Sequence, residues 1–187
     1  LENLDEDDAA VKKYDEALKN DPRFELAWKR KLALLTKLGR IEEALDLLEM
    51  AVEQNPDDET MWYQRGRALH IMKRYDQALV SVEKAAALKD GYHQAWREKA
   101  EILADEEKLD EALAAVERAI EMAQDEPEGH ALKGRLLKDA GRNEQAVAAL
   151  ARLLELQPAS EPGYTMLGFV LQKLGRFEDA SKRPSFW

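Results

Sequence analysis

The sequence predicts an all-α protein made of repeated helical hairpins, and three observations support this prediction. The composition combines 45% apolar with 35% charged residues, which is typical of helical proteins. Rings recur every 34 residues, at Trp28, Trp62 and Trp96, and then as His130 and Tyr164. No stretch alternates apolar and polar residues for long, so the sequence predicts no strands.

Alanines follow the same period in the second half of each repeat. One series has no exception and consists of Ala10, Ala44, Ala78, Ala112, Ala146 and Ala180. Glycines lie about midway between a ring and the next alanine of this series, where a helix is expected to end, at Gly39, Gly141 and Gly175. A further slot holds Pro22, Pro56 and Pro158, with Asp90 and Gln124 between them. Each period therefore predicts a helix, a short turn, a second helix and a loop.

This pattern resembles the tetratricopeptide repeat, a helical hairpin of 34 residues with an early aromatic, an alanine in its second helix and a proline at its end. The resemblance implies a right-handed superhelical solenoid of antiparallel helix hairpins. The sequence departs from the family pattern at the two missing prolines, at His130 in the aromatic slot and at Leu32, where a small residue is usual. The register never slips, so these departures do not affect the predicted fold.

The predicted boundaries follow the period along the chain. Residues 1–24 read as the second helix of a partial repeat, and four complete repeats follow at 25–58, 59–92, 93–126 and 127–160. Residues 161–180 read as a partial repeat, and 181–187 as an irregular tail. A single hairpin cannot bury the apolar stripes of both its helices, so we expect residues 1–180 to form one solenoid domain.

Composition also limits the partners. The formal charge of −10 disfavours general binding to nucleic acid or to anionic membranes. No apolar run approaches the roughly 20 residues that cross a bilayer. The absence of cysteine excludes disulfides and thiolate metal sites, and it fits a reducing, cytoplasmic location.

The sequence gives no indication of catalysis. His93 lies at a repeat boundary, His130 occupies a packing slot, and only His70 falls on an exposed helical face. Zinc, phosphate-loop and nucleophile-elbow motifs are missing, so we expect no enzyme activity, no metal and no cofactor.

A cation follows the ring by one helical turn in four repeats, at Lys31, Arg65, Lys99 and Lys133, whereas the fifth repeat has Leu167. One interpretation is structural, with the methylenes packed on the preceding helix, the charge in water and a cation–π contact to the ring. The other is a periodic row that binds an acidic partner. For the tryptophans themselves, a packing role is preferred to a ligand cage.

Stacked hairpins present a concave surface lined by their first helices. In the family that the chain resembles, groove residues occupy the second, fifth, ninth, twelfth and thirteenth places of each repeat, and here these places hold seven basic residues and four acids. We therefore predict a groove that binds a peptide or partner segment, with an acidic one favoured, or else a solvated face whose basic bias is chance. The candidate residues are Lys29, Lys37, Tyr63, Arg67, His70, Arg97, Arg135 and Lys138.

Some relatives grip a terminal carboxylate with a lysine, asparagine and arginine set, but Ala33, Gln64 and Glu98 do not complete that set here. The partial repeats at both ends allow two further interpretations. Uncapped ends could pair between copies and form a homo-oligomer, which would make the chain a structural self-assembly unit. Alternatively, the chain is a regulatory array taken from a longer protein.

Overall fold

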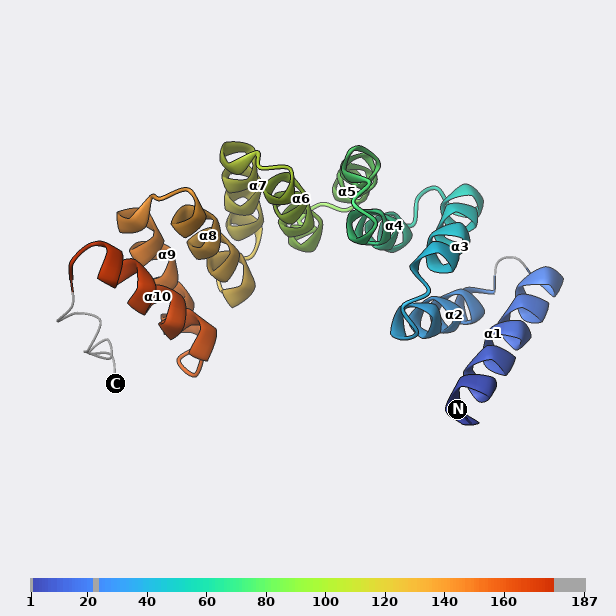
Figure 1. Ribbon diagram of the computed structural model, residues 1–187. Coiled ribbons are helices and arrows are strands. Elements are labelled where there is room, and N and C mark those ends of the chain that lie inside the picture. The colour runs from blue at the N-terminus through green and yellow to red at the C-terminus, as the bar shows by residue number, and fades with distance from the viewer. Residues whose placement is uncertain (1, 22–23, 177–187) are drawn as a thin grey trace. The chain divides into compact units, whose positions relative to one another are not determined.

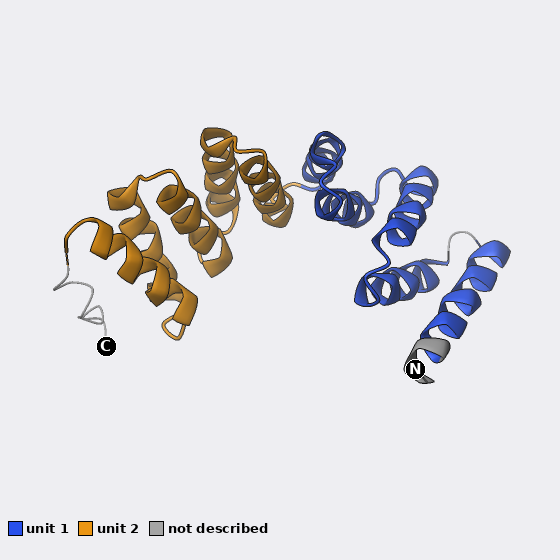
Figure 2. Cartoon of the chain, in the orientation of Figure 1, with its two compact units in different colours: residues 1–89 blue, residues 90–187 orange. Residues whose placement is uncertain are grey.

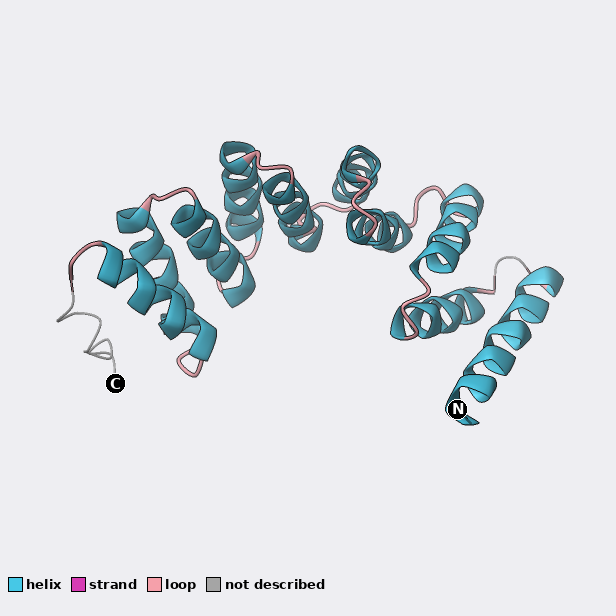
Figure 3. Ribbon diagram, in the orientation of Figure 1, coloured by secondary structure: helices cyan, strands magenta, loops and turns pink. Residues whose placement is uncertain are grey.

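The computed structural model describes residues 2–21 and 24–176, and within these ranges all regular structure is helical, with no strand (Figure 1 and Figure 3). The chain divides into two compact units, residues 1–89 and 90–187 (Figure 2). The first unit, unit 1, contains α1 (Glu2–Asn20), α2 (Glu25–Lys37), α3 (Ile41–Gln54), α4 (Glu59–Ile71) and α5 (Tyr75–Leu88). The second unit, unit 2, contains α6 (His93–Asp105), α7 (Leu109–Met122), α8 (Pro127–Asp139), α9 (Asn143–Leu156) and α10 (Glu161–Lys173).

The helices confirm the predicted all-α class. Each complete repeat contains a first helix of 13 residues and a second of 14 residues. The start of a second helix that the sequence predicts in the last partial repeat falls mostly on residues 177–180, and these residues and the tail 181–187 are outside the described part. The single domain expected over residues 1–180 stays a prediction.

The turn inside each hairpin requires a left-handed residue. Gly39 and Gly141 supply it with φ of 69° and 71°, and Lys73 and Glu107 hold the same slot with φ of 57° and 62°. The residue that follows closes the helix end, as where Arg142 N–H donates to Leu137 O at 2.8 Å. The sequence therefore located this turn even in the repeats that lack the glycine.

The alanine series belongs to the buried side of the second helices. Ala44, Ala78, Ala112 and Ala146 are all buried. Gly66 of α4 lies so close to α5 that an added Cβ would stand 2.5 Å from Val82 Cγ1, which explains a glycine inside a helix. At Gly168 no described atom lies within 4 Å of an added Cβ, so the described residues provide no such reason there.

Successive hairpins pack through a slot near the start of the first helix, which holds a small residue in four repeats and the buried Met61 in α4. An added Cβ at Gly129 of α8 would stand 2.9 Å from Ile120 Cγ1 of α7, and one at Gly163 of α10 would stand 2.9 Å from Leu154 Cδ2 of α9. Ala27 and Ala95 hold the same place in their repeats and are buried. Small side chains there let the helices approach closely enough to cover the leucines beneath.

In two repeats the residue in the aromatic slot ties the first helix to the loop before it. Trp62 Nε1 donates to Pro56 O at 2.8 Å, and His130 Nε2 lies 2.9 Å from Gln124 O, six residues earlier in both cases. Because a carbonyl oxygen only accepts, the His130 contact places a proton on Nε2. His130 therefore makes the same loop contact as the tryptophan of an earlier repeat, and the packing role predicted for this slot is supported.

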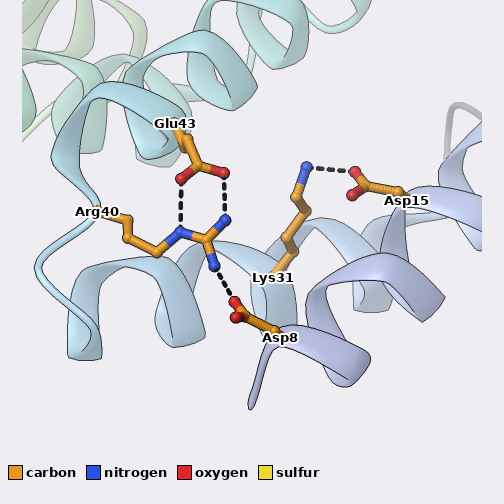
Figure 4. A network of polar contacts seen from close by, with 5 residues as sticks. All are labelled: Asp8, Asp15, Lys31, Arg40 and Glu43. Carbon is orange, nitrogen blue, oxygen red and sulfur yellow. Dashed lines mark hydrogen bonds and ion pairs between the residues drawn. The ribbon is translucent and has the colours of Figure 1, made fainter. Parts of the chain in front are cut away.

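The cation after the ring pairs with the preceding second helix. Lys31 Nζ lies 2.5 Å from Asp15 Oδ1 of α1, and Lys133 Nζ lies 3.0 Å from Glu117 Oε1 of α7 (Figure 4 shows the Lys31 pair). Arg65 donates to Ser81 Oγ at 2.7 Å and lies 3.4 Å from Glu49 Oε1. The expected cation–π contacts occur at Arg65 over Trp62, 5.8 Å from the ring centroid, and at Lys99 over Trp96, at 5.2 Å.

A second set of ion pairs lies at the start of the second helices. Arg40 binds Glu43 through two nitrogens at 2.5 and 2.6 Å and reaches Asp8 of α1 at 2.6 Å, as drawn in Figure 4. Arg142 pairs with Asp110 of α7 in the same way. A cation at a helix N-terminus opposes the helix dipole, and these carboxylates offset that cost. Hydrogen bonds from Arg40 also lower the pKa of Glu43.

The left-handed turn gives a first prediction. Glu107→Gly should raise the free energy of unfolding by about 0.5–1 kcal/mol. Removing a side chain from the left-handed conformation gains about 1–2 kcal/mol, and the greater freedom of glycine in the unfolded chain offsets part of this gain. The reciprocal change Gly141→Glu should lower stability by a similar or larger amount. Urea denaturation followed by circular dichroism measures both changes. A Glu107→Gly protein less stable than the parent would contradict the left-handed conformation at residue 107.

The cation slot gives a second prediction. The fifth repeat has Leu167 where the others have a cation, and Ala151 where α7 has Glu117. The double variant Lys133→Leu with Glu117→Ala should therefore stay within about 1 kcal/mol of the parent, because a partly exposed pair contributes less than that. The single variant Lys133→Glu places like charges together and should be clearly less stable than the double variant in the same urea titration. If the Lys133→Glu protein were as stable as the double variant, the Lys133–Glu117 ion pair would have no role in stability.

Candidate functional site

The candidate residues lie on first helices, as the spacing predicted, and they divide between the units. Unit 1 holds Lys29 and Lys37 on α2, and Tyr63, Arg67 and His70 on α4. Unit 2 holds Arg97 on α6, and Arg135 and Lys138 on α8. Each unit therefore carries its own set of candidate contacts.

Lys29 lies in an acidic setting. It forms an ion pair with Glu25, which raises the pKa of Lys29 and lowers that of Glu25, chiefly through the hydrogen bond between them. Asp58 adds a further electrostatic contribution to the pKa of Lys29. A cleft of about 690 Å³ adjoins these residues, and its lining also includes Asp57 and Glu59. The surroundings of Lys29 therefore oppose the basic character that its position in the sequence suggested.

Lys37, at the other end of α2, lies 3.6 Å from Asp7 of α1. The Lys37 side chain is 70% exposed, so the pair is weakly held and an incoming carboxylate could replace Asp7.

The α4 residues form a row along one side of the helix. Arg67 lies over the Tyr63 ring, 5.9 Å from its centroid, and the rings of His70 and Tyr75 meet edge to face at 6.0 Å. Arg67 is exposed, whereas Tyr63 and His70 are half-buried. Ile71 completes the row with 59% of its surface exposed. We call these four residues (Tyr63, Arg67, His70 and Ile71) the α4 row.

In unit 2 the predicted cations have acidic partners. Arg135 of α8 forms an ion pair with Glu101, which holds the same place in α6, one repeat earlier. Lys138 Nζ lies 2.9 Å from Asp139 Oδ1. Arg97 Nη1 lies 4.0 Å from Glu126 Oε2, which His93 Nε2 also approaches at 3.3 Å. The first-helix face of unit 2 is therefore closer to charge balance than the count of cations suggested.

Phe169 of α10 was not among the candidates, although it occupies the ninth place of its repeat. Its side chain is 48% exposed, and the ammonium groups of Lys138 and Lys173 lie 5.8 and 5.5 Å from its ring centroid. The sequence signal was an aromatic at a groove place with a lysine four residues later.

A cleft of about 610 Å³ lies away from these residues, between α7, α8 and α9. Its floor is apolar and includes Leu113, Ile120 and Leu137. The ion pairs Lys133–Glu117 and Arg142–Asp110 involve its lining residues, so the charges around it largely satisfy one another.

The described residues hold no group of three or more His, Asp or Glu side chains placed to bind a metal ion. None of the described helices is both long and apolar enough to cross a membrane. The candidate residues present charged, aromatic and aliphatic side chains, which are suited to contacts with a partner.

Comparisons with known proteins agree with the repeat pattern. Three family models, each described as "Tetratricopeptide repeat", match residues 25–68, 69–136 and 127–160. No curated protein matches the sequence significantly.

Solved structures with the same fold include PilW, described as a type IV pilus biogenesis factor, with a TM-score of 0.80, 20% identity and coverage of 95% of this chain and 83% of that chain. A thermophilic TPR protein of Thermus thermophilus aligns with a TM-score of 0.72 and 23% identity over 92% of this chain and 94% of that chain. YrrB, described as a TPR protein with an unusual peptide-binding site, aligns with a TM-score of 0.68 and 20% identity over 90% of this chain and 87% of that chain. With its three family matches and its stacked helical hairpins, this chain belongs to the tetratricopeptide repeat family.

Proposed function

We propose that the protein is a non-catalytic interaction scaffold that binds a segment of a partner protein along the α4 row of unit 1. The family supports the general role, since stacked hairpins present extended surfaces for other proteins. The observation that carries the specific proposal is the α4 row itself, where an exposed arginine lies over the Tyr63 ring and the half-buried His70 and exposed Ile71 follow on the same side of the helix.

Arg67 gives this row its selectivity. Its guanidinium group lies against the Tyr63 ring, and this contact limits the side-chain freedom lost when a ligand binds. A planar guanidinium group accommodates a carboxylate through two parallel hydrogen bonds. An acidic side chain of the partner segment is therefore the favoured contact at this position.

The rest of the row supplies contact area. Tyr63 and His70 present ring surface, and Ile71 presents an aliphatic side chain that is more than half exposed. Aromatic and arginine side chains contribute most of the binding free energy in many interfaces. The favoured segment thus carries an apolar residue close to its acidic one.

Lys29 and Lys37 have secondary parts in this proposal. Lys29 is already paired with Glu25 beside an acidic cleft, so it attracts an acidic segment only weakly. Lys37 can exchange Asp7 for a carboxylate of the partner. The peptide-binding site in the description of YrrB supports the view that a related fold holds peptides.

Two other interpretations stay predictions. Pairing between copies through the ends depends partly on residues 177–187, which lie outside the described part of the chain. That the chain is a regulatory array taken from a longer protein also stays a prediction.

Arg67→Glu should weaken binding of an acidic peptide at least tenfold, or by about 1.4 kcal/mol, because it replaces attraction with repulsion. The probe is a fluorescein-labelled dodecapeptide that alternates glutamate with leucine and tyrosine, measured by fluorescence polarisation against a version with lysine in place of glutamate. Lys29→Glu should change the affinity less than Arg67→Glu does.

The matched control is Lys84→Glu, which reverses an exposed cation on the second helix α5 of the same unit. It should leave the affinity within about twofold of the parent, apart from a small long-range effect of charge. Equal loss in the control and in Arg67→Glu, or equal binding of the acidic and basic peptides, would refute the proposal.

A further inference from the structure

Phe169 is an exposed aromatic side chain on a helix whose neighbouring aliphatic side chains are buried. On α10, Leu167, Val170 and Leu171 are buried, whereas the Phe169 ring keeps 48% of its surface exposed. An isolated exposed apolar side chain is common on proteins. Phe169 differs because of the charges that surround it.

Two cations from two helices approach the Phe169 ring. Lys173 is one helical turn further along α10, and its Nζ lies 5.5 Å from the ring centroid. Lys138 comes from α8 of the preceding repeat, and its Nζ lies 5.8 Å from the same centroid. Both distances are within the range of cation–π attraction, so the three side chains support one another's positions.

Among the residues that the structure describes, the acids paired with this cluster do not balance its charge. Lys138 pairs with Asp139, but within the described part of the chain Lys173 forms no ion pair with a carboxylate. Glu101, on the first helix α6, already forms an ion pair with Arg135. Counted over residues 2–21 and 24–176, the ring has two ammonium groups near it and one of them is paired with a carboxylate, so the cluster carries excess positive charge.

We propose that Phe169, Lys138 and Lys173 form a docking point in unit 2 for a partner segment that carries a carboxylate next to an aromatic side chain. The partner ring packs on the exposed part of Phe169 in an offset or edge-to-face arrangement. The adjacent carboxylate pairs with Lys173 and, by displacing Asp139, with Lys138. This inference rests on the proposed function in treating first helices as the binding surface, and it adds a second contact point and the chemistry of its ligand.

Charge selects this ligand over the alternatives. The chain carries a net charge of −10, and two lysines cannot supply the run of phosphate contacts that nucleic-acid binding needs. A carboxylate alone would bind weakly, because both ammonium groups are partly solvated. The ring beside it adds the apolar contact that raises the affinity.

The test uses the full chain and a fluorescein-labelled pentapeptide with tryptophan at its centre and glutamate at the other four positions. Phe169→Ala and Lys173→Glu should each weaken binding at least about fivefold in fluorescence polarisation. Phe169→Trp and Lys173→Arg keep the ring and the charge, and they should bind within about twofold of the parent. Circular dichroism should show unchanged helix content for all four, because the substituted side chains lie on the surface.

The matched control is Arg118→Glu, which reverses an exposed cation on the second helix α7 of the same unit and should leave binding unchanged. Unchanged affinity in Phe169→Ala and Lys173→Glu would overturn this proposal. If Arg67→Glu then abolishes binding of the same peptide, the α4 row stands and only the α10 docking point is lost. The opposite pattern would remove the α4 row and keep the docking point, and no binding by the parent up to about 1 mM would refute both.

Discussion

Packing between consecutive hairpins is the constraint on which the structure of each unit depends. The second helix of one hairpin packs against the first helix of the next, as α7 does on α8 and α9 on α10. Small residues at the point of closest approach, such as Gly129 and Gly163, permit this packing. Because the apolar stripes are used between helices, the solvent-facing side of each first helix is left to side chains that do not serve the core. Those faces carry both candidate binding surfaces.

The period of 34 residues predicted the fold because the same physical requirement recurs in every hairpin. Ala78 and Ala112 are fully buried, and a larger side chain there would have to displace its neighbours, which fits an alanine that repeats at every period. The ring slot tolerates a change, since His130 makes the loop contact that Trp62 makes. The left-handed turn likewise accepts Glu107 where other repeats have glycine, at an energetic cost rather than a change of fold.

The candidate site was less predictable, because the charge of a surface depends on which groups face one another across helices. Counting groove places put Lys29 and Arg135 on first helices, where the structure has them, but did not reveal that Glu25 and Glu101 pair with them. The partner of the cation slot could have been found, since Asp15, Glu49, Glu83 and Glu117 also recur every 34 residues. The sequence marked Phe169 as an aromatic at a groove place, but the approach of Lys138 to its ring could not be predicted, because that contact depends on how neighbouring hairpins pack.

The most direct test of the account compares the hairpin of residues 127–160 alone with the two-hairpin fragment 93–160, by circular dichroism and urea denaturation. If the neighbouring hairpin buries the apolar side chains that a single hairpin leaves exposed, the single hairpin should show little helix and no cooperative transition. The longer fragment should unfold cooperatively. A single hairpin that is as helical and as stable per residue as the longer fragment would contradict the central claim that each hairpin depends on the next.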